Sequence, residues 1–187
     1  MKITYRILSL LLIVVVTGCA SMGSGTKEEK QQAIRTMKDS ALTQLFKEKP
    51  DTRTQLTSAP GYAVFSNVNV NVILFAAGTG FGLVKDNSSG EITYMNMAEA
   101  GVGFGLGVKD YRIVMVFHSQ EAMRQFVESG WTFGGNADAA LKANDKGGAV
   151  QGEAYFGNVT VYTFTESGIA LQATVKGTKF WVDGALN

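Results

Sequence analysis

The stretch from residue 61 to residue 84 reads GYAVFSNVNVNVILFAAGTGFGLV, and it decides the class of fold. Asn67, Asn69 and Asn71 alternate with valines, which is the period of a strand with one wet face and one dry face. A second run, 101–108, reads GVGFGLGV and again places glycine at every other position. Many strands without regular helical crossovers predict an α+β protein whose sheet is largely antiparallel and glycine-rich, or a partial barrel.

The same period predicts the remaining strands and their turns. Lys109-Asp110 is predicted to be a tight connection, and Lys176-Gly177 is predicted to lead into the last strand. Gly157-Asn158 has the composition of a two-residue hairpin turn. The predicted strands are 62–65, 78–84, 92–97, 102–108, 111–117, 154–156, 159–164, 169–175 and 178–182.

The alternating glycines predict a packing device. Gly78, Gly80 and Gly82 share one strand face, so a backbone, a helix or a large aromatic ring can approach that face closely. Glycine in a strand costs about 0.5–1 kcal/mol relative to alanine, so a repeated glycine indicates a geometric demand. Neither run contains Gly-x-Gly-x-x-Gly, and the chain contains no Gly-x-x-x-x-Gly-Lys-Ser/Thr, which argues against nucleotide binding.

Two helices are predicted, an N-terminal amphipathic helix and one short internal helix. Thr26 and Glu29 have the spacing of a capping box, and Pro50 bounds the first helix. The second is capped by Ser119 and closed by Gly130. The apolar stripe of the first helix favours docking on the domain over lying on lipid. Its members are Ile34, Met37, Ala41, Leu42, Leu45 and Phe46.

The first 26 residues have the pattern of a lipoprotein leader and tether. Lys2 and Arg6 precede an apolar run, 7–16, of about ten residues, which is too short to cross a bilayer core that needs roughly twenty. Two other interpretations are a buried helix and a plain cleaved signal. The predicted signal-peptidase site is Val16, Thr17 and Gly18, and the predicted lipid attachment site is Cys19.

These boundaries predict a signal peptide at 1–18, a lipidated tether at 19–26 and a single domain at 27–187. The pattern is similar to bacterial lipoproteins in which the cysteine carries a diacylglyceryl thioether and an N-acyl chain such as palmitate, and several acyl chains anchor permanently. By resemblance to the Gram-negative sorting pattern, Ala20 in place of Asp favours the outer membrane, with the protein facing the periplasm.

The charge and the reactive residues exclude several classes of protein. The formal charge of +1 becomes −1 when Lys2 and Arg6 are removed, so nucleic-acid binding is not expected. With Cys19 acylated, His118 has no thiol partner, and one histidine without a free cysteine makes a zinc site improbable. No cofactor or metal is expected, and no catalytic residue is assigned. Single carboxylates such as Glu91, Glu99, Asp110 and Asp138 show no partner in the sequence.

An ordered set of motifs resembles one known family. Pro60-Gly61-Tyr62-Ala63-Val64-Phe65 precedes the glycine strands, and Gly130-Trp131-x-Phe133-Gly134 follows the internal helix. Gly168-Ile169-Ala170 and Gly177-Thr178-Lys179-Phe180 close the pattern. Together they resemble the SYLF domain family, also described as a lipid-binding and actin-regulator family, over residues 57–182. The chain departs from the pattern at Gly135-Asn136-Ala137-Asp138.

The resemblance implies a non-enzymatic domain that binds membrane lipid. The resemblance implies lipid contact through basic and amphipathic features near the N-terminus of the domain, as in eukaryotic members, and the residues expected to play that part here are Lys47, Lys49 and Arg53. The expected partners are the membrane, phospholipid head groups and an envelope protein. Three alternatives stay open: an envelope hydrolase with a carboxylate site, a structural envelope protein that binds a protein partner, and an integral outer-membrane barrel suggested by the alternating strands.

Overall fold

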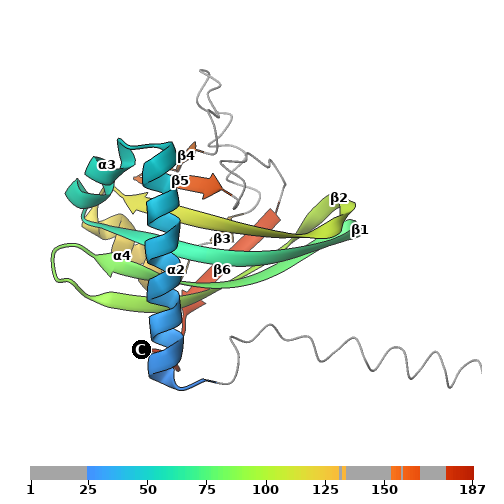
Figure 1. Cartoon of the computed structure of the whole chain (residues 1–187), viewed down its shortest axis with the longest axis horizontal. Helices are drawn as coiled ribbons and strands as arrows, with labels where there is room; N and C mark the ends of the chain where they lie inside the picture. Colours follow the sequence, from blue (N-terminus) through green and yellow to red (C-terminus); the bar gives the residue numbers. More distant parts are fainter. Residues whose placement is uncertain (1–24, 131, 134–152, 157, 165–175) are drawn as a thin grey trace, which may run out of the picture.

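The computed structural model describes residues 25–130, 132–133, 153–156, 158–164 and 176–187 (Figure 1). The predicted signal peptide, most of the tether and the predicted strand 169–175 lie outside the described residues. Within them the protein is an α+β structure with a six-stranded sheet in which every recorded pairing is antiparallel. This confirms the predicted fold class, and the N-terminal helix is present.

Two unusually long strands dominate the sheet. Strand β1 (Gly61–Asp86) and strand β2 (Ile92–Phe117) pair along their whole length, from Gly61 opposite Phe117 to Lys85 opposite Ile92. The prediction of several shorter strands in this region was therefore wrong. Only the turn after Asp86 interrupts the chain here, and Gly90 in that turn has a φ of 80°, a backbone conformation that favours glycine.

The tight connection predicted at Lys109-Asp110 is also wrong. Both residues lie inside β2, where Lys109 pairs with Asn69 and Asp110 pairs with Val68. Asp110 forms an ion pair with Arg112, two residues further along the same strand face. The charge is therefore matched within the strand, so its polarity does not indicate a turn.

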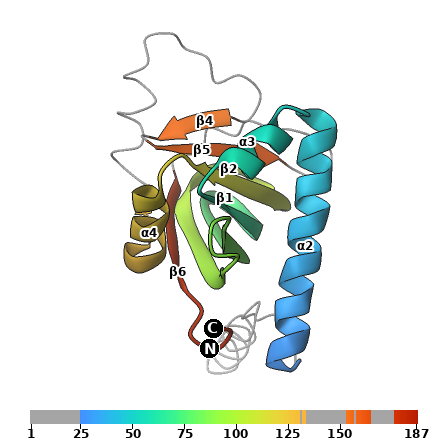
Figure 2. The same ribbon diagram turned by 90° about the vertical axis from the view of Figure 1, so that its left-hand side faces the viewer.

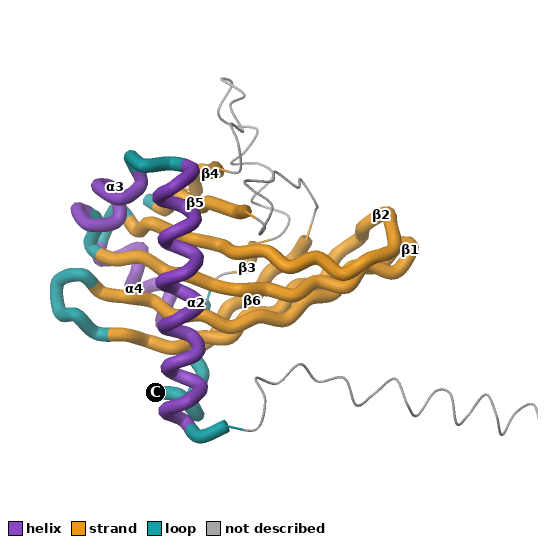
Figure 3. Tube along the Cα trace, viewed as in Figure 1, coloured by secondary structure: helices purple, strands orange, loops and turns teal. Residues whose placement is uncertain are grey.

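The long hairpin folds back on itself. Both strands run to the far tip in Figure 3 and return, and the pairing is irregular at Ile73 and Phe75. A Cβ added at Gly82 would overlap the carbonyl oxygen of Val64 and the ring of Phe65, while one at Gly80 would overlap the carbonyl of Ser66. The two halves of β1 therefore face one another, which confirms that these glycines permit a close approach.

Each half of β2 carries a different outer strand. Its first half pairs with β6 (Lys176–Val182), which continues to β3 (Thr132–Phe133), and its second half pairs with β5 (Val159–Phe164) and then β4 (Glu153–Phe156). The β4–β5 hairpin confirms the strands predicted on either side of Gly157-Asn158. Lys176 and Gly177 belong to β6 instead of preceding it, because they pair with Gly101 and Ala100.

The main core lies between the two halves of the sheet. Helix α4 (Gln120–Ser129) closes one side of it with Met123 and Phe126, and its N-cap and C-cap are Ser119 and Gly130, as predicted. Aromatic rings fill the centre, with the rings of Phe65 and Phe180 4.7 Å apart. The other buried members include Ala63, Val84, Met95, Met97, Ile113, Met115, Phe117, Val159 and Val161.

Helix α2 (Lys27–Glu48) packs across the outer surface of the sheet (Figure 2). The predicted capping box is present, since Glu29 N–H donates to Thr26 Oγ1 and Thr26 N–H donates to Glu29 Oε2. Ile34 is buried in one outer cluster, and Ala41 and Leu45 are buried in another. The helix therefore docks on the domain, as predicted.

A short helix, α3 (Thr52–Ser58), follows α2 and was not predicted. Its seven residues are too few to show a helical period, and it is fixed by the burial of Thr52 and Leu56. Among the helices of the described residues, none has the length and apolar character needed to cross a bilayer.

Candidate functional site

The three predicted head-group residues gather at the corner between α2 and α3. Lys47 lies in the last turn of α2, Lys49 is its C-cap, and Arg53 lies in the first turn of α3. The C-cap residue orders this corner, because its N–H donates to Leu45 O at 2.7 Å and its carbonyl accepts the Thr52 hydroxyl at 2.6 Å. We call these three residues the basic corner.

Aromatic rings support two of the three cations. The guanidinium carbon of Arg53 lies 4.4 Å from the ring centroid of Phe46, and Lys49 Nζ lies 5.1 Å from the ring centroid of Tyr162. The Tyr162 hydroxyl in turn donates to Gln55 Oε1 at 2.6 Å. Cation–π contacts of this kind attract a cation to the face of the ring and favour one position for it.

The charge of the basic corner is modest. Across residues 47–53 three cations are offset by Glu48 and Asp51, which leaves a sum of 3 − 2 = +1. An arginine and two lysines can hydrogen-bond phosphate oxygens, the arginine through two N–H groups at once. The arrangement suits a phosphate monoester or diester at the surface and offers no group for chemistry on it.

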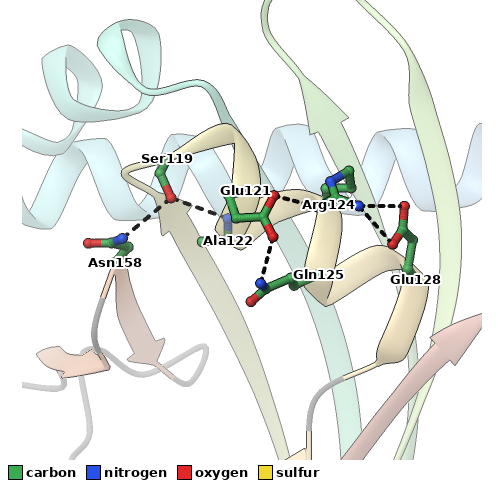
Figure 4. A network of polar contacts seen from close by, with 7 residues as sticks. All are labelled: Ser119, Glu121, Ala122, Arg124, Gln125, Glu128 and Asn158. Atoms are coloured by element: carbon green, nitrogen blue, oxygen red, sulfur yellow. Dashed lines mark hydrogen bonds and ion pairs between the residues drawn. The ribbon is translucent and has the colours of Figure 1, made fainter.

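A second polar site lies on α4 (Figure 4). Arg124 donates to Glu121 Oε2 at 2.5 Å and to Glu128 Oε2 at 3.2 Å, and Gln125 Nε2 donates to Glu121 Oε1 at 2.6 Å. The hydrogen bond from Arg124 lowers the pKa of Glu121, and the same contact raises the pKa of Arg124. At the N-cap of α4, the Ser119 hydroxyl accepts from Ala122 N–H at 3.2 Å and from Asn158 Nδ2 at 3.5 Å.

A cleft of about 500 Å³ borders this network and is lined in part by Glu121, Gln125, Ser129 and Asn158. Glu121 is the single carboxylate among the described lining residues, and Arg124 and Gln125 occupy its oxygens. A glycosidase needs two carboxyl groups facing one substrate. The described lining therefore does not supply the carboxylate pair that the hydrolase alternative requires.

A buried polar cluster in the interior was not predicted from the sequence. Asn67 Nδ2 donates to the Tyr111 hydroxyl at 2.8 Å, and the Thr178 hydroxyl donates to Glu99 Oε1 at 3.2 Å. Burial and then the nearby charge of Glu99 raise the pKa of Tyr111 far above its usual range. Glu99, which shows no partner in the sequence, thus has one partner on β6, Thr178, and one on the other half of its own strand, Tyr111. Glu99 lies between the predicted strands 92–97 and 102–108, so the sequence pattern did not place it inside a strand.

The only histidine has a structural environment. The backbone N–H of His118 donates to Asn158 O at 2.8 Å, and the ring Nε2 of His118 lies 2.7 Å from the Thr160 hydroxyl. In the part of the chain that the structure describes, no three His, Cys, Asp or Glu side chains gather in a way that could hold a metal ion. The predicted anchor residue Cys19 and the recognition residues Val16, Thr17 and Gly18 lie outside the described residues, so these assignments stay predictions.

Comparison with known proteins relates the C-terminal half of the chain to one family. Residues 98–187, which comprise most of β2, helix α4 and the C-terminal strands, match the family model Ysc84, described as "Las17-binding protein actin regulator". Residues 98–187 therefore match the SYLF domain family, which is the family that the motifs resemble. The matched range does not include the basic corner or the predicted leader.

A curated relative extends the likeness toward the N-terminus. The chain is 32% identical over 158 residues to "Beta cell expansion factor A" of Aeromonas veronii, and the alignment covers 84% of this chain. It covers 59% of the relative, so this chain spans about three fifths of the length of the curated protein that it matches.

Proposed function

We propose that this protein is a lipid-anchored, non-enzymatic lipid-binding protein of the bacterial envelope. Cys19 carries the acyl anchor, the anchor inserts into the outer membrane, and the domain faces the periplasm. The basic corner binds the phosphate of phospholipid head groups. The observation that carries the proposal is that Lys47, Lys49 and Arg53 lie at one corner between two helices, where aromatic rings contact Lys49 and Arg53.

The family supports a binding role over a catalytic one. Its description names binding to Las17 and regulation of actin, and it names no reaction. The lipid contact that the SYLF resemblance implies is the part of this role that suits an envelope protein. A protein partner in the envelope is the second ligand class that the family description favours.

Flotation with vesicles tests the basic corner. The domain from residue 25 onward should float with vesicles rich in phosphatidylglycerol at low salt, and less so at higher salt, because screening weakens exposed charges. The triple substitution Lys47→Gln, Lys49→Gln and Arg53→Gln should abolish flotation. A matched control replaces three exposed cations elsewhere on the molecule, Lys27, Arg35 and Arg124, by Gln and should keep it. Equal loss in both triple variants would show a general charge effect and refute the corner as the site.

Membrane fractionation tests the anchor separately. Cys19→Ser in the full chain should move the protein from the salt-washed membrane fraction to the released fraction, because the thioether-linked chains are then absent. Cys19→Ala should behave alike, and Ser21→Ala serves as the neutral control. Retention of Cys19→Ser on washed membranes would contradict the anchor.

A further inference from the structure

We propose that the outer face of β6 around Trp181 is the surface on which the anchored protein rests against the lipid bilayer. This inference rests on the proposed anchor at Cys19 and concerns a part of the molecule other than the basic corner. It assigns the bilayer interface as the occupant of an exposed sheet face. We call this surface, formed by Trp181 and Lys179, the β6 face.

The β6 face presents an exposed aromatic ring. Trp181 is 40% exposed and the next residue, Val182, is 38% exposed. Phe180, which precedes Trp181, is fully buried in the main core. Because side chains alternate along a strand, Trp181 and Lys179 lie on the face opposite Phe180. Trp181 pairs with Asn96 on β2, and Asn96 pairs with Phe81 on β1, so an aromatic side chain lies at each end of this cross-strand row.

The chain enters the domain at the same end. Lys27 Nζ donates to Asn187 O at 2.8 Å, and Gln31 Nε2 donates to Leu186 O at 2.7 Å, which ties the first turns of α2 to the residues after β6. Asp183 N–H donates to Tyr94 O at 3.0 Å, which fixes the end of β6 beside β2. Figure 2 shows the start of α2 and the C-terminal residues together at one end of the molecule.

The length of the tether limits how far this end can leave the bilayer. Cys19 precedes Gly25 by six residues, which span at most about 20 Å when fully extended. Helix α2, with 22 residues, is about 33 Å long. An anchor at Cys19 therefore keeps the start of α2 within about 20 Å of the bilayer, and the β6 face lies beside this end of the helix.

The chemistry of the β6 face suits a lipid interface. A tryptophan ring buries its apolar body at head-group depth and leaves its N–H for a polar partner, which is why such rings concentrate at membrane interfaces. A lysine on the same face reaches phosphate oxygens while its stem covers apolar surface. One ring binds weakly alone, but the tether raises its effective concentration at the surface, so the contact sets orientation more than affinity.

Tryptophan quenching by lipid tests this contact. Trp131→Phe leaves Trp181 as the single tryptophan of the acylated full chain, which is reconstituted into vesicles of phosphatidylcholine and phosphatidylglycerol brominated near the head group. We expect Trp181 emission to fall by about half relative to plain vesicles, as for a ring at head-group depth. Circular dichroism checks the fold. Trp181→Phe in the natural background should lose the same quenching, which keeps the test valid if Trp131→Phe misfolds.

A matched control places the probe elsewhere. Val68, 45% exposed and on the other half of β1, is replaced by tryptophan in a chain that lacks both natural tryptophans. Its emission should be equal in both vesicle types. Unquenched Trp181 in vesicle-bound, acylated protein overturns the β6 face and leaves the anchor standing, as does burial of Trp181 in a concentration-dependent dimer. An unmodified Cys19 by mass spectrometry overturns the proposed function, and the β6 face falls with it.

Discussion

Gly82 shows how a single residue permits the tight curvature of the sheet. It lies where the returning half of β1 passes over the outgoing half, and the space of its missing side chain is taken by Val64 O and the ring of Phe65. The energetic cost of glycine in a strand is offset by a backbone approach that no other residue allows. The alternating pattern was therefore interpreted correctly from the sequence, although the partner that fills the space was not.

Gly82→Ala should lower the free energy of unfolding by at least about 1–3 kcal/mol, or prevent folding, because the new methyl group overlaps both backbone and ring. Gly184→Ala is the matched control, since a Cβ there meets nothing within 4 Å, and it should change stability by no more than about 0.5 kcal/mol. Urea denaturation followed by circular dichroism measures both. Equal stability of the two variants would contradict the close approach.

Asp86 makes the turn between the long strands sensitive to acid. The Ser88 hydroxyl donates to it at 2.5 Å, and further hydrogen bonds come from the backbone of Ser88 and Ser89 and from Gln120 on α4. The side-chain hydrogen bond from Ser88 is the largest cause that holds the pKa of Asp86 well below its ordinary value of 3.8. The folded chain therefore binds fewer protons than the unfolded chain between these two pKa values.

The contribution of Asp86 to stability should be fully present above the unfolded pKa and be lost as pH falls toward the lowered folded pKa. Asp86→Asn should thus destabilise the protein most near neutral pH, and the difference from the parent should shrink as pH falls below about 4. Urea titrations at several pH values measure it. Asp51→Asn, at an exposed carboxylate outside this turn, is the control, and a pH-independent difference for Asp86→Asn would refute the assignment.

At the level of elements, helix α2 is the clearest case of agreement between pattern and structure. Its capping box, its apolar stripe and the proline after its end were all visible in the sequence, because each depends on residues close together in the chain. Docking, however, depends on what the rest of the fold offers. Leu45, 1% exposed, packs with Leu56 of α3 and Val64 of β1, and these partners are distant from the stripe in the sequence.

Leu45→Ala should cost about 2–5 kcal/mol, the range for removing a buried leucine side chain. Thr43→Ala, two residues earlier at an exposed position, should cost no more than about 0.5 kcal/mol. Thermal and urea unfolding report both. A small effect of Leu45→Ala would show that the helix is dispensable to the fold and would reopen the lipid-facing interpretation of the stripe.

The strands were harder to delimit than the helix. Local polarity suggested a break at Lys109-Asp110, but the ladder continues there because β1 supplies Asn69 and Val68 as partners. Pairing between strands is a long-range property, so a charged pair in a strand looks like a turn until its neighbour is known.

At the scale of the whole molecule, a polar cluster spans the two facing halves of the sheet. Asn67 and Tyr111 come from one half, and Glu99 and Thr178 come from the other. The negative charge of Glu99 helps to raise the pKa of Tyr111, so the two groups face each other across the interior. Buried polar groups of this kind favour one arrangement of two layers, since any other leaves them without partners.

Tyr111→Phe should destabilise the protein by about 1–3 kcal/mol, because the Asn67 amide then loses a buried hydrogen-bond acceptor. Tyr62→Phe, which removes a half-buried hydroxyl outside this cluster, should have a smaller effect. Urea unfolding measures the difference. Equal values would show that the cluster does not hold the two halves together.

The same scale governs how the protein meets a membrane. The basic corner and the β6 face lie toward opposite ends of α2, which is about 33 Å long, so both reach one bilayer only when the helix lies along its plane. Neither the capping box nor the apolar stripe of α2 indicates where the β6 face lies relative to the basic corner. This placement arises from hydrogen bonds between the first turns of α2 and the last residues of the chain.

The sequence by itself determined the antiparallel α+β class, the boundaries and caps of α2 and α4, and the resemblance to the SYLF family, because these depend on periods and motifs within short windows. Only the tertiary structure decided that two strands run unbroken through 26 residues each, that Gly80 and Gly82 face the same strand further back, and that Glu99 meets Tyr111. The physical reason is that pairing and layer packing join residues far apart in the chain, and no local pattern records which partner each residue will find.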